Sequence, residues 1–312
     1  MPLSKTSQSD LLLVLVTILS ALSWIFSREA VQLMPPLLFM CLRFLLAGSL
    51  LAVLGRRQLS RINADQAWRA IQVGLVFGFA MCFWVLGLTH ASHVGEGAFL
   101  TILGVLMVPV IGRLLFAETP PVSTWIAIPV ALIGLALLAL KEGFRPETGQ
   151  IFFLISAFGF AFYYTLNTRA ANVSSSLSKA GELLQKQGVP PLALTTLMVL
   201  TVSAVTGLAS LAMEPWQPTF ENFDPMLTVW IGASAIIGTS ARFFLQTWAQ
   251  SLSTTSHGVV IMIVEPVWVA LLAAIWFGET MAPMQLAGCL LIFTALLVNR
   301  WNAVRKVLKS VL

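Results

Sequence analysis

Three charged side chains lie inside long apolar stretches of the sequence, where an unpaired charge is costly. Glu265 stands within IMIVEPVWVALLAAIWFGET (261–280), while Arg43 and Arg242 lie deep in two other apolar stretches. A charge at the centre of a bilayer costs about 2.5–3.5 kcal/mol on insertion scales. We therefore expect all three side chains to face the protein interior, where they bind a solute or pair with one another.

Polar and aromatic side chains recur every three or four residues near these charges, as they do along one face of a helix. Aromatic faces mixed with a few hydrogen-bonding groups are typical of small-molecule sites. The predicted substrate-binding residues are Glu265, Arg242, Trp24, Tyr163, Asn167, Gln246, Trp268 and Arg43. The alternative for each charge is a buried ion pair that only fixes helix packing, and a single aromatic ring more often belongs to the core or faces lipid.

Pro266 follows Glu265 and cannot donate the backbone hydrogen bond that a helix interior needs. In a continuous α-helix it frees the carbonyl of Met262 and kinks the helix. We expect this kink to open the backbone near the middle of the membrane, although a kink that serves packing alone is equally compatible. Arg242 and Glu265 differ in depth by roughly 5 Å at 1.5 Å per residue, so we also expect these two side chains to approach each other.

The elements that position these residues are predicted to be membrane helices. The chain has 312 residues, 58% hydrophobic and 10% charged, with a mean hydropathy of +0.88, whereas a soluble domain carries about 25% charged residues. A helix of about 20 apolar residues crosses a bilayer core of about 30 Å. Ten segments of this kind cover residues 10–32, 34–54, 67–89, 92–116, 121–141, 149–171, 190–213, 226–250, 255–277 and 282–302.

Ten crossings place both termini on the same side of the membrane. Most Lys and Arg residues outside the segments then gather on that side, namely Lys5, Arg56, Arg57, Arg61, Arg69, Arg169, Lys179, Lys186, Arg300, Arg305, Lys306 and Lys309. The other side holds Lys141 and Arg145. The positive-inside rule therefore predicts cytoplasmic termini in the cell (inner) membrane. The net charge of +5 reflects this topology, and no nucleic-acid partner is expected.

The second half of the sequence repeats the first. The dipeptide Glu-Thr at 118–119 recurs at 279–280, and the pair Pro-Pro at 35–36 recurs at 190–191. Each half contains five predicted crossings, an odd number, so the second half enters the membrane in the opposite direction. Inverted repeats are common in secondary transporters, where the solute site lies near the midplane between the halves. The halves differ in charge, because Met198 stands where the first half has Arg43.

Two five-helix repeats, one with a helix ending EPVWVALLAAIWFGET before a segment containing LAGCLLIF, resemble the EamA repeats of the drug/metabolite transporter superfamily. The region of Trp24, Pro36 and Arg43 is similar to the first two helices of that repeat, and the resemblance covers nearly the whole chain. It implies an all-α integral membrane protein of ten transmembrane helices in two inverted five-helix repeats, residues 1–141 and residues 149–312 with a cytoplasmic tail. It also implies transport of small organic metabolites, often outward.

We predict a secondary transporter that moves an amino acid or a related compound by alternating access, in the direction of export. Its partners are the solute and the lipid bilayer, and a coupling proton is a candidate second ligand. Toxic amphipathic cations and nucleotide sugars are alternative solutes; an intramembrane lipid-processing enzyme or a structural subunit is the alternative class. The sequence contains no GxSxG, HExxH or phosphate-loop motif, so we expect no catalytic residue, cofactor or metal. The segment 174–188 is expected to be a loop with one short helix.

Overall fold

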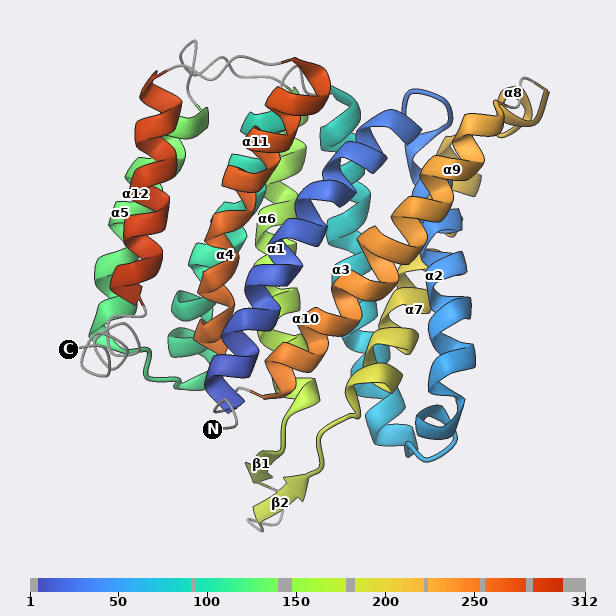
Figure 1. Ribbon diagram of the computed structural model, residues 1–312. Coiled ribbons are helices and arrows are strands. Elements are labelled where there is room, and N and C mark those ends of the chain that lie inside the picture. Colours follow the sequence, from blue (N-terminus) through green and yellow to red (C-terminus); the bar gives the residue numbers. More distant parts are fainter. Residues whose placement is uncertain are drawn as a thin grey trace.

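The chain forms a bundle of long helices (Figure 1), seen in a computed structural model. The structure describes residues 5–90, 94–139, 148–177, 183–221, 224–252, 256–278 and 283–299. The positions predicted for Lys141, Arg145, Lys179 and the basic C-terminal residues 300–312 lie outside the described residues, as does the repeated Glu-Thr pair at 279–280.

Helices make up almost all of the regular structure, as the composition predicts. The first half contains α1 (Lys5–Ala30), α2 (Pro36–Leu59), α3 (Ala64–His90), α4 (Val94–Phe116) and α5 (Val122–Ala139). The second half begins with α6 (Thr148–Ala171), α7 (Pro191–Met213), the short α8 (Gln217–Glu221) and α9 (Pro225–Ala233). It continues with the π-helix η1 (Ser234–Ala241), α10 (Arg242–Ser251), the 3-10 helix η2 (Ser256–Val264), α11 (Glu265–Phe277) and α12 (Pro283–Asn299).

Seven of the described helical stretches are long and apolar enough to cross a membrane: Ser7–Ala30, Pro36–Leu59, Ala64–His90, Thr148–Ala171, Pro191–Met213, Pro225–Ser251 and Val259–Phe277. Three shorter apolar stretches, Leu100–Phe116, Val122–Leu137 and Leu286–Ala295, accompany them. Together they fall on the ten predicted segments. The described chain is therefore helical with several candidate membrane spans, while the count of ten crossings and their inverted arrangement remain predictions.

Two segments differ from their predicted form. The predicted segment 226–250 is not one regular helix, because α9 and α10 are joined by η1, whose wider turn lets the hydroxyl of Thr239 donate to the carbonyl of Ser234 at 2.9 Å. The predicted loop 174–188 contains no helix in its described residues. It holds instead an antiparallel hairpin of β1 (Ser174–Leu177) and β2 (Leu183–Lys186).

The helices pack in pairs that link the two halves of the chain. In Figure 1, α5 and α12 lie side by side at one edge of the bundle, and α2 and α7 lie toward the opposite edge. Between these edges α3 packs on α6, and α1 packs on α10 and α11. Small residues allow close approach, as is usual between membrane helices: a Cβ on Gly74 would lie 2.6 Å from Cβ of Thr201 in α7.

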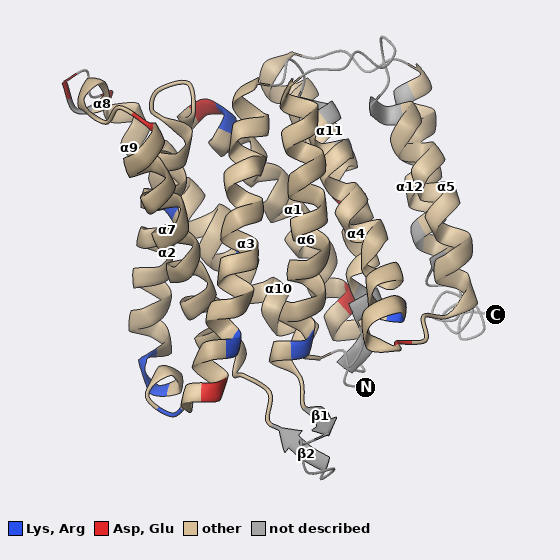
Figure 2. Cartoon of the chain, turned by 180° about the vertical axis from the view of Figure 1, so that it is seen from behind, with Lys and Arg blue, Asp and Glu red and all other residues tan. Residues whose placement is uncertain are grey.

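The charged residues are concentrated at the ends of the bundle, with most basic residues at one end. Figure 2 shows Lys and Arg at the ends of α2, α3 and α6 that lie near the hairpin. The beginning of α1 and the end of α12 lie at this same end in Figure 1. This arrangement agrees with the prediction that an even number of crossings separates the two termini.

Candidate functional site

Glu265 lies where the helix that carries it changes its winding. The 3-10 helix η2 ends at Val264, and α11 begins with Glu265 and Pro266. A proline in the first turn of an α-helix costs no hydrogen bond, because that N–H has no partner within the helix. The predicted interruption at Pro266 therefore takes the form of a change from 3-10 to α geometry beside Glu265.

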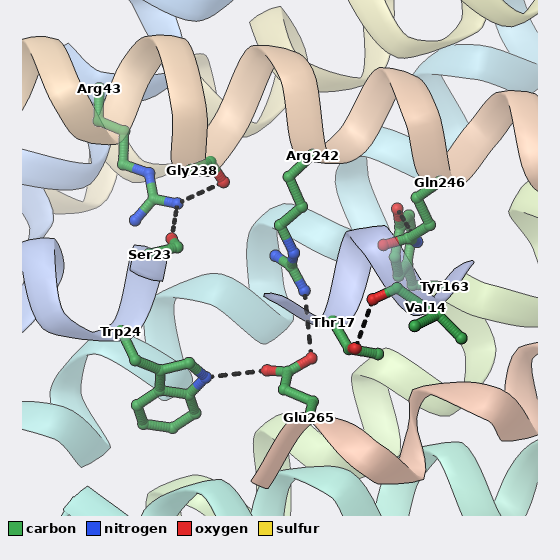
Figure 3. A network of polar contacts seen from close by, with 10 residues as sticks. All are labelled: Val14, Thr17, Ser23, Trp24, Arg43, Tyr163, Gly238, Arg242, Gln246 and Glu265. Carbon is green, nitrogen blue, oxygen red and sulfur yellow. Dashed lines mark hydrogen bonds and ion pairs between the residues drawn. The ribbon is translucent and has the colours of Figure 1, made fainter. Parts of the chain in front are cut away.

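The carboxylate of Glu265 is buried and held between two side chains from other helices (Figure 3). The indole Nε1 of Trp24 in α1 donates to Oε1 at 2.9 Å. Nη2 of Arg242 in α10 lies 3.8 Å from Oε2, an ion pair longer than a hydrogen bond. The predicted approach of Arg242 to Glu265 is confirmed, and a pair of this length is weaker than a direct charged hydrogen bond.

Arg43, from α2, is held nearby by neutral groups. Its guanidinium donates to the hydroxyls of Thr239 at 2.6 Å, Ser27 at 2.7 Å and Ser23 at 2.6 Å. It also donates to the carbonyl oxygen of Gly238 at 3.1 Å. No carboxylate of the described residues pairs with it, so its positive charge is solvated by dipoles and is not neutralised.

These three charges line one small cavity of about 30 Å³. Its walls come from both halves of the chain and consist of Ser20, Ser23, Trp24, Arg43, Met81, Trp84, Ala98, Thr101, Ile102, Phe160, Tyr164, Arg242 and Glu265. Two guanidinium groups face one carboxylate, so the lining carries an excess of one positive charge. Such a cavity suits a solute with a negatively charged group and an apolar part.

Three of the predicted site residues form a second polar cluster that does not line this cavity. Nε2 of Gln246 donates to the hydroxyl of Tyr163 at 2.9 Å. Nδ2 of Asn167 donates to Thr247 at 3.2 Å and to the side-chain oxygen of Gln250. All these side chains are buried, and their bonds join α6 to α10 in the turns of α10 that follow Arg242.

Trp268 lies away from the other predicted residues. Its ring packs edge-on against Phe293 of α12, with 6.4 Å between the ring centroids. It is absent from the cavity lining, although a spacing of three residues places it on the same side of the helix as Glu265. Within the described part of the chain its indole N–H has no hydrogen-bond partner.

Several cavity residues were not among the predicted site residues. Trp84 packs edge-on against Trp24 with 4.8 Å between the ring centroids. It shares a helix face with Phe77 and Met81 at spacings of four and three, so the periodicity that identified other stripes could have found it. Thr101 had no comparable signal, because it is an isolated hydroxyl in an apolar helix.

The fold and this cavity define a multi-pass membrane protein with a charged site enclosed by its helices. The model of the EamA-like transporter family matches the chain twice, over residues 7–140 and over residues 147–301. The chain belongs to the EamA-like transporter family, as its resemblance to the drug/metabolite transporter superfamily predicted.

Individual relatives are distant but cover most of the chain. An uncharacterized transporter of Archaeoglobus fulgidus is 24% identical over 72% of this chain and 73% of its own length. The uncharacterized transporter YvbV of Bacillus subtilis is 24% identical over 97% of this chain and 95% of its own. A solved crystal structure has a similar fold, with a TM-score of 0.72 and 19% identity over 95% of this chain and 98% of that one.

Proposed function

We propose that the protein is a secondary transporter that carries a small organic solute across the membrane by alternating access between two inverted repeats. The observation that carries this proposal is the cavity shared by Arg43, Arg242 and Glu265, which both halves of the chain line. Sites at the interface of inverted repeats are typical of secondary transporters. The helices that supply the charges are therefore the ones whose relative movement would open the site.

The charges in the cavity favour a solute that carries a carboxylate. An arginine fork binds a carboxylate through two parallel hydrogen bonds, and Nε of Arg242 has no hydrogen-bond partner among the described residues. Glu265 can accept from an ammonium group, and the rings of Trp24 and Trp84 offer an apolar surface beside it. An amino acid or a related zwitterion combines these groups, whereas an amphipathic cation would face the excess positive charge.

The cavity is closed around its charges. Its volume of about 30 Å³ has room for about two or three water molecules at roughly 10–15 Å³ each. Sites that hold small molecules measure about 300–1,000 Å³. Transport therefore requires these helices to separate, and a solute can drive this only if it binds the two states with different affinity.

Replacing Glu265 with Gln tests the proposal in proteoliposomes. The amide keeps an oxygen that can accept from Trp24, but it removes the negative charge that faces Arg242. We expect uptake of labelled amino acids to fall at least tenfold. The same change at Glu221, which is exposed at the end of α8, should leave uptake at the wild-type rate.

Matched amounts of folded protein, checked by gel filtration, make the outcome decisive. Uptake by the Glu265→Gln protein at the wild-type rate would show that Glu265 has only a structural role. Turnover of a membrane lipid without solute flux would favour the alternative of a lipid-processing enzyme. Comparing uptake with and without an imposed pH gradient then tests whether a proton is the coupling ion.

A further inference from the structure

A second, larger cavity lies at the basic end of the bundle and shares no lining residue with the charged site. It measures about 550 Å³ and opens between the first turns of α3 and the last turns of α6. Its lining consists of Arg69, Gln72, Val73, Leu75, Val76, Leu166, Arg169 and Ala170, none of which belongs to the proposed solute site.

The polarity of this groove changes along the helix axis. Arg69 and Val76 are seven residues apart, which corresponds to roughly 10 Å at 1.5 Å per residue. The two arginines stand at the outer end, and Val76 and Leu166 line the inner end. Beyond Leu75, itself 45% exposed, the exposed ring of Phe79 continues an apolar path along the surface of α3. Charge at one end and apolar surface at the other match the two parts of a phospholipid.

Both guanidinium groups are anchored but retain unused donors. Arg69 pairs with Asp65 at 2.9 Å and donates to the backbone oxygen of Gln187 at 2.6 Å. Arg169 lies over the ring of Phe116, 4.1 Å from its centroid, and no described carboxylate pairs with it. An arginine has five N–H donors, so each side chain is fixed in place with donors left for an oxygen anion.

The charge of the groove is positive, since Arg69 and Arg169 outnumber Asp65 by one. Figure 2 shows basic residues at the adjacent ends of α3 and α6, with one acidic residue nearby. Basic pockets between transmembrane helices at the cytoplasmic side bind anionic headgroups. We propose that this groove binds an anionic phospholipid, with its phosphate between Arg69 and Arg169 and one acyl chain along Leu75, Val76 and Leu166.

Native mass spectrometry of the detergent-purified protein tests the site directly. The probe is an equimolar mixture of phosphatidylglycerol and phosphatidylcholine with identical acyl chains. We expect the wild-type protein to retain phosphatidylglycerol preferentially. Arg69→Gln combined with Arg169→Gln should reduce its affinity for that lipid by roughly tenfold or more for each guanidinium group removed.

A matched control separates the groove from the general charge of this end. Arg56→Gln combined with Arg57→Gln removes the same charge from two exposed residues at the same end and should leave the preference unchanged. Val76→Trp keeps both arginines and fills the apolar end, so it should also release the lipid. Glycerol phosphate, which has the headgroup chemistry without the chains, should not compete.

Three results would each overturn the proposal. The first is a lipid preference that survives in the double glutamine protein, and the second is an equal loss in the Arg56 and Arg57 control. The third is effective competition by glycerol phosphate, which would assign the arginines to a soluble anion. If the double glutamine protein does not fold, Val76→Trp decides alone, because retention of phosphatidylglycerol in that protein contradicts the groove.

Discussion

At the scale of single residues, Arg43 shows how neutral groups can accommodate a cation inside a membrane bundle. Three hydroxyls and one carbonyl accept from it, and the rings of Phe39 and Phe44 lie 5.8 and 5.5 Å from its guanidinium carbon. Its charge is thus stabilised locally but remains available to an anion in the cavity. Such a residue can attract a solute, whereas a fully paired one would only fix packing.

Glu214 illustrates a different use of a charge, and its side chain is only partly buried. Its carboxylate accepts from the backbone N–H groups of Leu37 and Leu38 at 2.8 Å each and from the hydroxyl of Ser210 at 2.7 Å. The first turn of α2 begins with Pro36 and has no side-chain cap of its own. A residue at the end of α7 therefore caps a helix in the other half of the chain, where a negative charge is also favoured by the helix dipole.

We predict that Glu214→Ala destabilises the folded protein by about 1–3 kcal/mol, because it leaves two backbone donors without their charged acceptor. The measurement is the unfolding midpoint in a detergent titration, followed by circular dichroism. Glu221→Ala provides the control, since that side chain is exposed and its bond among the described residues is accepted from Gln217 of its own helix. Equal midpoints for the two variants would show that the cap contributes nothing.

The charged residues of the site could be predicted from the sequence better than their neighbours. Glu265, Arg242 and Arg43 were found because an ion within an apolar stretch has to be buried, and Trp24 because it continues a polar stripe. Tyr163, Asn167 and Gln246 do not line the cavity. The periodicity of the sequence predicts which face of a helix is polar, but not which part of that face meets a cavity. Trp268 packs against Phe293 of α12, since a shared helix face does not determine which neighbouring helix a long side chain contacts.

At the scale of elements, the two helices that carry Arg242 and Glu265 are both irregular next to these residues. The π-helix η1 ends immediately before Arg242, and the 3-10 helix η2 ends immediately before Glu265. Pro266 indicated in the sequence that the helix carrying Glu265 is interrupted. Nothing in the sequence indicated the π-helix, because the residues SAIIGTSA are compatible with a regular α-helix. We attribute the π-helical form to packing of this segment against α1 and α2.

Gly238 provides a test of that packing. A Cβ at this position would lie 2.8 Å from Oγ of Ser23 and 3.4 Å from Nη2 of Arg43. We predict that Gly238→Ala costs about 1–3 kcal/mol of stability, as overpacking usually does, and displaces Ser23 from Arg43. The matched control is Gly232→Ala in α9, where a Cβ meets nothing within 4 Å and higher helix propensity should stabilise by about 0.5–1 kcal/mol.

Thermal midpoints of both glycine variants, measured in the same detergent, decide the point. A lower midpoint only for Gly238→Ala is expected. Equal midpoints would mean that η1 can move away from α1 without cost, and that the arginine network does not depend on this close approach.

At the scale of the whole molecule, the helix contacts form the pattern expected of two related halves. When each helix is replaced by its counterpart in the other half, the same pairs of helices remain in contact. If α1 corresponds to α6, α3 to α9 and α10, and α4 to α11, the contact of α3 with α6 corresponds to that of α10 with α1. The contact of α4 with α6 likewise corresponds to that of α11 with α1. In the contacts of α2 with α7 and of α5 with α12, each helix packs on its own counterpart in the other half. Such contacts are expected beside a two-fold axis.

The two Pro-Pro pairs support the same correspondence. Pro35 has φ −55° and ψ 132° before α2, and Pro190 has φ −54° and ψ 133° before α7. Figure 1 places the connection before α2 at one end of the bundle and the connection before α7 at the other. The repeat could be predicted from the sequence because prolines fix the backbone at equivalent positions. At other equivalent positions the residue types differ, as with Arg43 and Met198, so the sequence alone does not show that they correspond.

Gln32 and Gln187 allow the inversion to be tested at equivalent positions, since each lies three residues before a Pro-Pro pair and each is exposed. We replace one or the other with Cys in a protein whose Cys41, Cys82 and Cys289 are changed to Ala, and label intact cells with a membrane-impermeant maleimide. An inverted repeat with cytoplasmic termini predicts that Gln32→Cys is labelled in intact cells and that Gln187→Cys is labelled only after permeabilisation.

Ser60→Cys, exposed at the end of α2, should behave like Gln187→Cys. Labelling of Gln32→Cys and Gln187→Cys from the same side would contradict the inversion, and labelling of each from the side opposite to that predicted would keep the inversion but reverse the orientation.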